Sequence, residues 1–370
     1  MRAAILARAF ATDGFAVDLV SGGMPVPGLD LGGARLHQLS PARSRDESFS
    51  ELVDAAGAVV GNAWHAARAQ QLLSLLADVA PDIVLIEMYP FGRRALASEL
   101  SALVAAARAR TPRPVIVSSV RDILQVPRKP GRAAETASIL ARDFDLVLVH
   151  GDPAVIRLEE SFPLPEPQRR LLSYTGYVAP APTPARRHET GEVLVSAGGG
   201  AVGRALAAAA LSARPLSRLA QAPWRLLLGT NADPAEVASL AAEAPDNVTV
   251  EGARRDFPSL LGECRLSVSQ AGYNTVMDIL NARARAVLVP FEGQGETEQT
   301  MRAERFAARG LAHILAQARL SPAALAAAID AADAAPAPAL HGVDLGGAAA
   351  SVRLIRAALA RRRPEAASRG

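Results

Sequence analysis

The sequence alternates short apolar runs rich in β-branched residues with longer segments rich in alanine, leucine and arginine. Several of the short runs are apolar throughout, as parallel strands are when helices cover both faces of their sheet. The segments between them, such as Trp64–Val79 and Leu96–Arg110, carry apolar residues at the three- and four-residue spacing of a helix. The chain is therefore predicted to be an α/β protein with parallel sheets. The expected strands are Phe15–Val20, Asp82–Ile86, Val115–Ser118, Asp145–Val149, Glu192–Ser196, Arg225–Leu228, Asn247–Val250, Leu266–Ser269 and Ala286–Val289.

Length and composition restrict the class of protein. A chain of 370 residues corresponds to two or three domains at ~150 residues each, and its 50% hydrophobic content supports packed cores. The single cysteine, Cys264, excludes a disulfide framework and any zinc site built on two thiolates. No apolar run approaches the ~20 residues of a membrane-spanning helix, and MRAAILARAFATDG is too short and charged for a secretory signal. We expect a cytoplasmic protein, and its net charge of +3 does not predict a nucleic-acid partner.

A proline-dense, aperiodic stretch, VAPAPTPARRHETG, divides the sequence into two halves. We predict an N-terminal Rossmann-like domain over residues 1–178 and a linker over 179–191. A second α/β domain follows over 192–340, and a final helix with a basic tail over 341–370. The expected architecture is thus two Rossmann-like domains joined by this linker.

The first half opens on a helix. Doubly wound domains normally begin with a central strand and a glycine-rich turn, whereas here RAAILARAF follows Met1 directly and precedes FAVDLV. We expect either that the natural start lies upstream of Met1 or that the first sheet has no such central strand.

Two turns of the second half have the form of phosphate-binding loops. In EVLVSAGGGAVGRAL, Gly198, Gly200 and Gly203 fit G-x-G-x-x-G, which lets backbone N–H groups and a helix N-terminus approach an anion. A tight turn without a ligand explains the same pattern. A dinucleotide site would also need an acid at the end of the next strand, and RLLLGTN has none, although Asp233 follows shortly. An NAD-dependent oxidoreductase is disfavoured because two successive phosphate-type turns occupy the second half.

The second turn is LSVSQAGYNTVMDIL, in which Ser269–Gly272 follow a strand and a helix is expected to begin near Asn274 or Thr275. Asp278 lies one turn into that helix. It completes a capping box with Thr275, or it accepts hydrogen bonds from a vicinal diol such as a ribose. The pattern leaves both roles open.

The segment FEGQGETEQTMRAERFAARG follows the apolar run AVLVP. Glu296 and Glu298 stand where acids favour a helix dipole, and Gln299 falls in the first turn. Carboxylates and amides beside two anion-binding helix ends also suit the hydroxyl groups of a sugar.

SQAGYNTVMDIL and RAVLVPFEGQGETEQTMRAERFAARG together resemble the C-terminal domain of MurG-like glycosyltransferases of family 28. These enzymes have the GT-B fold, and the resemblance therefore implies two Rossmann-like domains facing a cleft. The first half resembles a subgroup of predicted bacterial glycosyltransferases through EMYPFGRRALASEL, SSVRDIL and DLVLVHGDP. The resemblance implies a nucleotide-sugar donor, with UDP favoured, an acceptor hydroxyl, inversion at the anomeric carbon, and neither metal nor cofactor.

The resemblance also implies which residues form the site. Asp278 would contact ribose, GARRDFPSLL would border the base, and Glu298 and Gln299 would contact the donor sugar, while the diphosphate would face Gly198, Gly199, Gly200, Ser269, Gln270, Ala271, Gly272, Asn274 and Thr275.

The first half offers ionisable residues after three successive strands. Glu87, Asp122 and His150 are the candidates for catalysis, although each residue is equally suited to capping the next helix. Arg93, Arg94 and Arg121 either bind an anionic donor or acceptor or pair with these acids. His37, His65 and His313 carry no supporting spacing and are interpreted as packing or surface residues.

Other interpretations stay open at this stage. A nucleotide-sugar epimerase shares the two-domain architecture, and His150-Gly151-Asp152 suits it. A non-catalytic nucleotide-sugar-binding protein is the third reading, because the Gly-rich first loop of the family, often with a Gly-His pair, would lie before Met1. Asp143-x-Asp145 precedes its strand and is disfavoured as a metal site. Arg361–Arg363 would give weak contact with the inner face of a membrane at ~1 kcal/mol each, and we expect a solvated tail.

Overall fold

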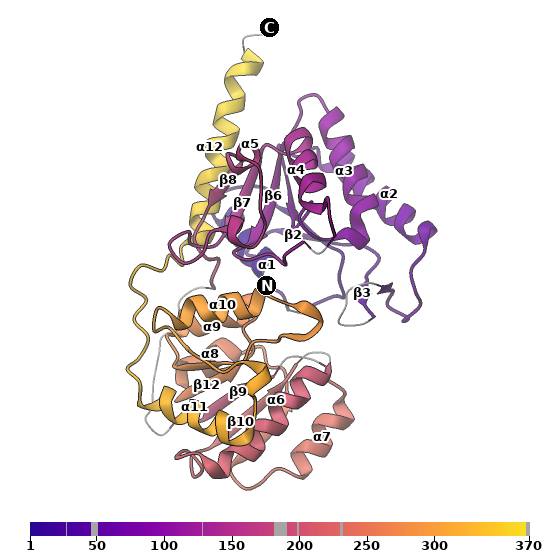
Figure 1. Cartoon of the computed structure of the whole chain (residues 1–370). Helices are drawn as coiled ribbons and strands as arrows, with labels where there is room; N and C mark the ends of the chain where they lie inside the picture. The colour runs from indigo at the N-terminus through magenta and orange to yellow at the C-terminus, as the bar shows by residue number, and fades with distance from the viewer. Residues whose placement is uncertain are drawn as a thin grey trace. The chain divides into compact units, whose positions relative to one another are not determined.

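The computed structural model describes residues 1–26, 28–45, 51–127, 129–180, 191–197, 200–229 and 232–367. The chain forms two compact units (Figure 1). The first comprises Met1–Val178 together with Asp344–Gly370, and the second comprises Ala179–Val343. Residues 181–190 of the expected linker lie outside the described residues.

The first unit is built on a parallel sheet of four strands in the order β5-β6-β7-β8. Along β6, Ile116 and Val120 face one core, and Val115 and Val117 face the other, which Ile355 completes. This alternation explains the apolar run at β6, because both faces of the strand are covered. The elements are β5 (Ile83–Glu87), β6 (Val115–Arg121), β7 (Leu146–His150), β8 (Leu172–Tyr174), α2 (Asn62–Val79), η1 (Arg94–Leu96), α3 (Ala97–Ala109), α4 (Arg132–Asp143), η2 (Leu158–Glu160), α5 (Glu166–Arg169) and α12 (Gly347–Ala367).

Two further strands of this unit form a separate parallel sheet, β1 (Asp18–Ser21) with β2 (Arg35–Gln38), after the opening helix α1 (Arg2–Thr12). A short antiparallel pair, β3 (Arg43–Ser44) and β4 (Leu52–Val53), follows. Among the described residues β1 pairs only with β2, and β5 only with β6. The parallel strands of the first unit are thus divided between two sheets, in agreement with the expectation of a sheet that lacks a central strand.

The second unit holds six parallel strands in the order β11-β10-β9-β12-β13-β14. The chain starts at β9, builds outward to β11, and then returns to the other side of β9 with β12. This is the doubly wound order, with its switch point between β9 and β12. The strands are β9 (Val193–Ser196), β10 (Trp224–Leu228), β11 (Val248–Gly252), β12 (Leu266–Ser269), β13 (Ala286–Leu288) and β14 (His313–Ile314). The helical elements are α6 (Gly200–Ala213), η3 (Arg214–Leu216), α7 (Pro234–Ala242), α8 (Phe257–Glu263), α9 (Tyr273–Ala282), η4 (Gly293–Gly295), α10 (Glu298–Ala307), η5 (Gln317–Arg319) and α11 (Pro322–Ala334).

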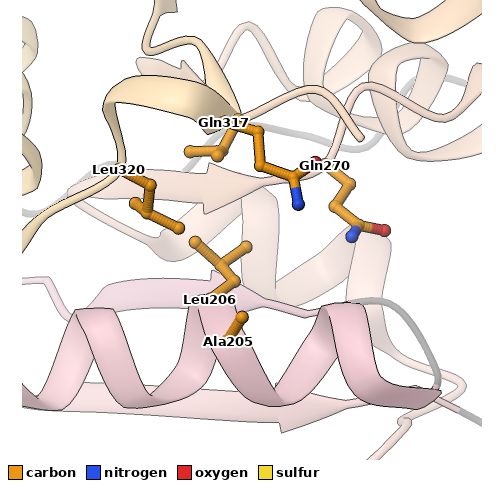
Figure 2. A pocket seen from close by; sticks show the side chains of 6 residues that line it. Ala205, Leu206, Gln270, Gln317 and Leu320 are labelled. Carbon is orange, nitrogen blue, oxygen red and sulfur yellow. The ribbon is translucent and has the colours of Figure 1, made fainter. Parts of the chain in front are cut away.

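A small cavity lies between α6 and the loops that follow the strands of this sheet. Figure 2 shows Gln270 and Gln317 reaching from those loops toward Leu206 of α6. Its volume of about 10 Å³ is roughly the space of one water molecule. The cavity is therefore too small to hold a nucleotide.

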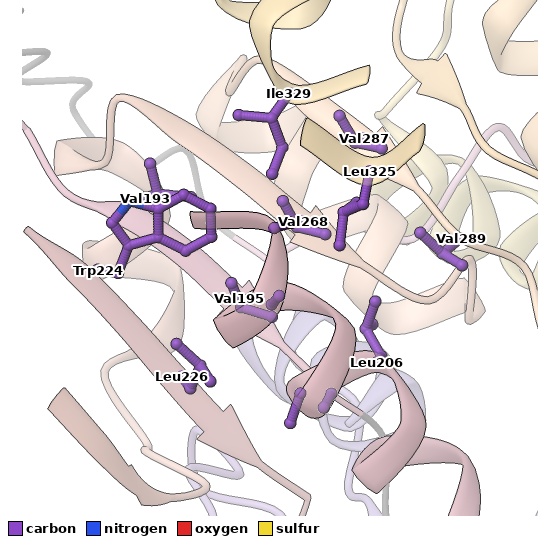
Figure 3. Packing of buried hydrophobic residues seen from close by; sticks show 14 of the residues in the cluster. Val193, Val195, Leu206, Trp224, Leu226, Val268, Val287, Val289, Leu325 and Ile329 are labelled. Atoms are coloured by element: carbon purple, nitrogen blue, oxygen red, sulfur yellow. The ribbon is translucent and has the colours of Figure 1, made fainter. Parts of the chain in front are cut away.

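The core of the second unit fills the face of the sheet under α6 and α11 (Figure 3). Val193 and Val195 of β9 point into it, together with the fully buried Trp224 of β10. The indole N–H of Trp224 donates to the carbonyl oxygen of Leu219 at 3.0 Å, so the one polar atom of that ring is satisfied. The packed core thus holds the strands in place up to their carboxyl ends.

No helix in the described part of the chain combines the length and the apolar character needed to cross a membrane. The last helix, α12, belongs to the first unit, where Arg362 donates to the carbonyl oxygens of Arg113 and Pro114. At least this arginine of the basic tail is engaged within the protein.

Candidate functional site

The switch point of the second sheet brings two loops together at one edge. Ser196 and Ser269 are paired in register at the ends of β9 and β12, so the loops after these strands leave the sheet side by side. Ligands of open α/β sheets bind at this position, beyond the carboxyl ends of the strands. Gly198 and Gly199 lie outside the described residues, and α6 begins at Gly200.

The loop after β12 leads into α9, whose N-terminus carries no side-chain cap. The N-cap residue is Gly272, with extended backbone, and a Cβ added there would meet no atom within 4 Å. The first-turn N–H groups of a helix have no intrahelical acceptor and favour an anion. The helix begins at Tyr273, within two residues of the expected start near Asn274 or Thr275.

Asp278 projects from the second turn of α9. Because the helix begins before Thr275, the capping-box alternative for Asp278 is wrong. No residue in the described ranges donates a hydrogen bond to its carboxylate, and burial raises the pKa of Asp278 to about 7. A half-buried carboxyl group without a partner is costly, and hydroxyl donors from a ligand would relieve that cost.

Gln299, in the first turn of α10, joins the loops that follow β12 and β13. Its Oε1 accepts hydrogen bonds from the backbone N–H of Ala271 at 3.0 Å and from that of Phe291 at 3.1 Å. Two N–H donors fix which end of the side-chain amide is the oxygen. The Nε2 group, which has no acceptor in the described part of the chain, is left to donate to a ligand.

Glu298, by contrast, is buried and paired. Its Oε1 accepts from the guanidinium of Arg302 at 2.9 Å, and the fully buried Arg302 also donates to the carbonyl oxygen of Ala271 at 2.9 Å. The Arg302 guanidinium lies 5.6 Å from the centre of the Tyr273 ring. The geometry therefore gives Glu298 a part in shaping the loop before α9, although the resemblance implied contact with the sugar.

Sequence reasoning missed Arg302, although the i, i+4 spacing from Glu298 was a usable signal. Of the other residues implied for the donor, Ser269 is fully buried, and its Oγ has no partner among the described residues. Asn274 is exposed on the first turn of α9. Glu296 caps α10, because its Oε1 accepts from the N–H of Glu298 at 2.6 Å.

Glu87, the first catalytic candidate of the other unit, lies among arginines. Its Oε1 accepts from Arg2 at 2.8 Å, and its Oε2 is 4.0 Å from Arg93. Burial favours the neutral acid, but the charges of Arg2, Arg93 and Arg121 outweigh it and lower the pKa of Glu87. An ionised carboxylate of low basicity is a poor proton acceptor near neutral pH.

His150 is fully buried at the end of β7. Its Nε2 is 2.8 Å from Ser119 Oγ and its Nδ1 is 3.0 Å from Thr175 Oγ1. Burial, assisted by the charge of Arg2, lowers the pKa of His150 well below its usual value. With both nitrogens occupied by hydroxyl groups, this arrangement favours a structural role over proton transfer.

The remaining first-unit candidates are engaged locally. Asp122 is fully buried, and a Cβ on Gly151 would lie 2.7 Å from its Cβ, so this contact requires glycine. Asp152 accepts from the N–H of Asp344 at 2.9 Å, which fastens the segment before α12. Arg94 pairs with Glu135 at 2.9 Å.

Asp143 and Asp145, the two acids with metal-like spacing, both pair with arginines. Asp143 lies 2.7 Å from Arg142, and Asp145 lies 3.1 Å from Arg113. No cluster of three metal-ligating side chains occurs within the described ranges.

Comparison with known proteins places this site within a family. Residues 193–339 match the glycosyltransferase family 28 C-terminal domain. The match covers most of the second unit. The matched residues contain β9 to β14, so the N-terminus of α9, Asp278 and Gln299 all lie within the matched region.

A curated relative supports the match. An 84-residue stretch of the chain is 37% identical to UDP-N-acetylglucosamine–N-acetylmuramyl-(pentapeptide) pyrophosphoryl-undecaprenol N-acetylglucosamine transferase of Rhodospirillum centenum. That stretch covers 23% of this chain and 22% of the relative, so the similarity spans about a fifth of either protein.

Solved structures similar to the whole chain are glycosyltransferases. CalG4, the calicheamicin glycosyltransferase, has a TM-score of 0.61 at 18% identity, covering 98% of this chain and 95% of its own. MurG of Acinetobacter baumannii has a TM-score of 0.57 at 17% identity, covering 96% and 95%. VinC in complex with dTDP has a TM-score of 0.57 at 16% identity, covering 97% and 94%. These likenesses show that the chain has the GT-B fold.

Proposed function

We propose that this protein transfers a sugar from a nucleoside-diphosphate sugar to an acceptor hydroxyl, with inversion and with neither metal nor cofactor. The observation that carries the proposal is the uncapped N-terminus of α9 at the switch point, with the unpartnered Asp278 on the same helix. The family 28 match and the glycosyltransferase neighbours support it.

The diphosphate is assigned to the N-terminus of α9. The backbone N–H groups that follow Gly272 point out of the helix end, where the dipole favours negative charge. Negative charge grows on the leaving diphosphate as the bond to the anomeric carbon breaks. Preorganised N–H groups stabilise that charge without a metal ion.

The ribose and the sugar are assigned to side chains. The Asp278 carboxylate would accept hydrogen bonds from the two ribose hydroxyl groups, and the Gln299 Nε2 group would donate to a hydroxyl of the sugar. The pair of Arg302 and Glu298 supports both contacts. Arg302 donates to the carbonyl oxygen of Ala271 in the loop before α9, and Glu298 holds the Arg302 guanidinium in place.

We propose uridine as the nucleoside. The curated relative uses a UDP-linked sugar by its name, while VinC is a structural neighbour in complex with dTDP. The relative is 37% identical over the 84 residues that match, whereas the structural neighbours share only the fold at under 20% identity. For this reason the relative carries more weight for the choice of base.

Calorimetric titration of the chain with UDP, dTDP, GDP and NAD tests the proposal. One nucleoside diphosphate is expected to bind, with NAD silent, and Asp278→Ala is expected to weaken that binding at unchanged thermal stability. Asp246→Ala removes an exposed carboxylate of the same unit and is the matched control. Equal affinity of the wild type and Asp278→Ala would refute the ribose assignment, and binding of NAD alone would refute the donor class.

Acceptor dependence separates transfer from its alternatives. A transferase releases the nucleoside diphosphate when an acceptor takes the sugar, whereas an epimerase converts the nucleotide sugar without releasing it. A binding protein does neither. Chromatography of UDP-N-acetylglucosamine after incubation with the protein distinguishes the three outcomes.

A further inference from the structure

A fully buried arginine of α10 binds the loop that leads into α9. Nη1 of Arg302 donates to the carbonyl oxygen of Ala271 at 2.9 Å, and its Nη2 donates to Oε1 of Glu298 at 2.9 Å. The guanidinium also lies 5.6 Å from the centre of the Tyr273 ring. These contacts give the guanidinium one defined orientation relative to the loop.

Both backbone polar groups of Ala271 are bound by side chains of α10. Its N–H donates to Oε1 of Gln299 at 3.0 Å, and its carbonyl oxygen accepts from Arg302. Ala271 is itself 0% exposed, so water does not compete for either group. The two hydrogen bonds therefore set the peptide units on either side of Ala271.

The second of these peptide units determines where the N–H of Gly272 points. The unit between Ala271 and Gly272 is trans, and in a planar trans unit the C=O and the N–H point in opposite directions. Because Arg302 holds the C=O toward α10, the N–H of Gly272 points away from α10. That N–H has no acceptor among the described residues, whereas backbone donors away from water are normally paired.

Gly272 borders open space in the protein. Its φ of −64° and ψ of 145° are values that any residue adopts, and an added Cβ would meet no atom within 4 Å. Neither backbone strain nor a contact in the described part of the chain requires glycine here. A glycine at such a position lets a ligand approach the backbone closely.

We propose that Arg302 is a positioning residue for donor binding, because its hold on the carbonyl oxygen of Ala271 turns the Gly272 N–H toward the diphosphate. The inference rests on the proposed function, which assigns the diphosphate to the N-terminus of α9. Arg302 itself does not touch the ligand, since it is 0% exposed. Glu298 balances its charge, so Arg302 acts by orienting a donor and not by attracting the anion.

The orientation of this peptide unit matters for binding and for the transfer step. An N–H that already points at the diphosphate needs no reorganisation when negative charge grows on the leaving group. Without Arg302 the carbonyl oxygen of Ala271 would be buried without a donor, which is costly. Turning the peptide unit over would relieve that cost, but it would present a carbonyl oxygen to the diphosphate in place of an N–H.

The first test variant is Glu298→Gln/Arg302→Met in the full-length chain. It removes the donor to Ala271 without leaving a buried charge unpaired. The matched control is Arg265→Met/Asp333→Asn, which removes another ion pair of the same unit, with 2.7 Å between Nε and Oδ1. Arg265 directly precedes β12 and so lies at the amino end of that strand.

The second test variant is Gly272→Pro, which removes the N–H itself. The φ of Gly272 matches the φ that proline requires. Calorimetry with UDP then compares the wild type, each variant and their combination in a double-mutant cycle. If Arg302 acts through the Gly272 N–H, its replacement has no further effect once that N–H is gone.

We expect Glu298→Gln/Arg302→Met and Gly272→Pro each to weaken UDP binding by ~10- to 100-fold. Their combination should be weaker than Gly272→Pro alone by no more than about two-fold, and Arg265→Met/Asp333→Asn should bind as the wild type does. Two losses that multiply in full would overturn the inference, because a general structural role of Arg302 acts in either background. Unchanged affinity of Glu298→Gln/Arg302→Met would also overturn it, whereas a wild type that binds no UDP would contradict the proposed function.

An independent measurement follows the Gly272 amide directly. In NMR spectra of the chain labelled with ¹⁵N-glycine, the Gly272 signal is identified by its absence from Gly272→Ala. UDP should shift this amide proton downfield in the wild type, and should not do so in Glu298→Gln/Arg302→Met. A wild-type signal that UDP leaves unmoved, or an equal shift in both proteins, would overturn the inference even where Gly272→Pro does not fold.

Discussion

Glu298 and Arg302 form a buried ion pair one turn apart on α10, with 2.9 Å between Oε1 and Nη2. Arg302 uses Nη1 to hold the carbonyl oxygen of Ala271, two residues before α9 begins. The pair thereby links the start of α10 to the helix end that we assign to the diphosphate.

Replacing Arg302 by alanine should destabilise the second unit. The change leaves the Glu298 carboxylate buried without its charge partner, which costs about 3–5 kcal/mol of unfolding free energy. Urea unfolding followed by circular dichroism measures this loss. Arg218→Ala removes an 84% exposed guanidinium and should change stability by less than about 0.5 kcal/mol. Similar curves for the two variants would show that the pair contributes little.

The variant Gln299→Glu tests the amide oxygen and the amide nitrogen of Gln299 separately. The carboxylate still accepts from Ala271 and Phe291, so the loops should stay in place, but the Nε2 donor is lost. A net hydrogen-bond contribution of about 0.5–1.5 kcal/mol predicts a two- to tenfold weaker Kd for UDP-N-acetylglucosamine, measured by calorimetry. UDP alone should bind equally to both proteins. An equal loss for UDP would place Gln299 at the nucleotide instead of the sugar.

Nucleotide affinity should rise with pH through the ionisation of Asp278. Burial raises the pKa of this carboxyl to about 7, so it becomes the better acceptor for ribose hydroxyl groups only above that pH. We expect the Kd for UDP to fall between pH 6 and pH 8, at about two-fold or more per pH unit near the midpoint. The control is Asp278→Asn, in which the UDP phosphate still titrates but the side chain at position 278 does not. Parallel pH curves for wild type and variant would contradict the ribose assignment.

The same carboxyl group makes a prediction for stability. Its pKa is higher in the folded protein than in the unfolded chain, so the folded state binds more protons between the two values. Stability of the apo protein should therefore decrease as pH rises from about 4 to about 7. Asp278→Asn should remove this part of the decrease, which thermal melts across that pH window would detect. A variant with the wild-type slope would show that Asp278 titrates normally.

The buried His150 should make stability depend on pH in the opposite direction. Burial lowers its pKa in the folded state, so below pH ~6.5 the unfolded chain takes up a proton that the folded protein does not. This group should make the protein lose stability as pH falls below that value. His150→Gln keeps polar atoms near Ser119 and Thr175 but cannot titrate. Its unfolding free energy should be lower at pH 7 and less dependent on pH, and an unchanged pH dependence would contradict the assignment.

The strands that sequence reasoning found are those with a covered face. Val115–Ser118 and Leu266–Ser269 are buried along their whole length. The sequence pattern did not predict β2, whose residues Arg35–Gln38 are mostly exposed. It also did not predict β14, which has only two residues. Neither strand carries a periodic apolar signal long enough to distinguish it from a loop.

Within the site, local patterns located the helix ends but not the contacts between distant segments. The hydrogen bond from Ala271 to Gln299 spans 28 residues, and that from Arg302 to Ala271 spans 31. No spacing rule covers such pairs, because packing of separate elements creates them. The capping-box alternative for Asp278 failed for a related reason. The extended backbone of Gly272 lets α9 start at Tyr273, before Thr275.

A crystal structure of the protein with UDP tests the central claim most directly. We predict that the diphosphate contacts the first-turn N–H groups of α9, beyond Gly272, and that the ribose hydroxyl groups lie within about 3 Å of the Asp278 carboxylate. A nucleotide bound away from α9, or a ribose turned away from Asp278, would contradict the account.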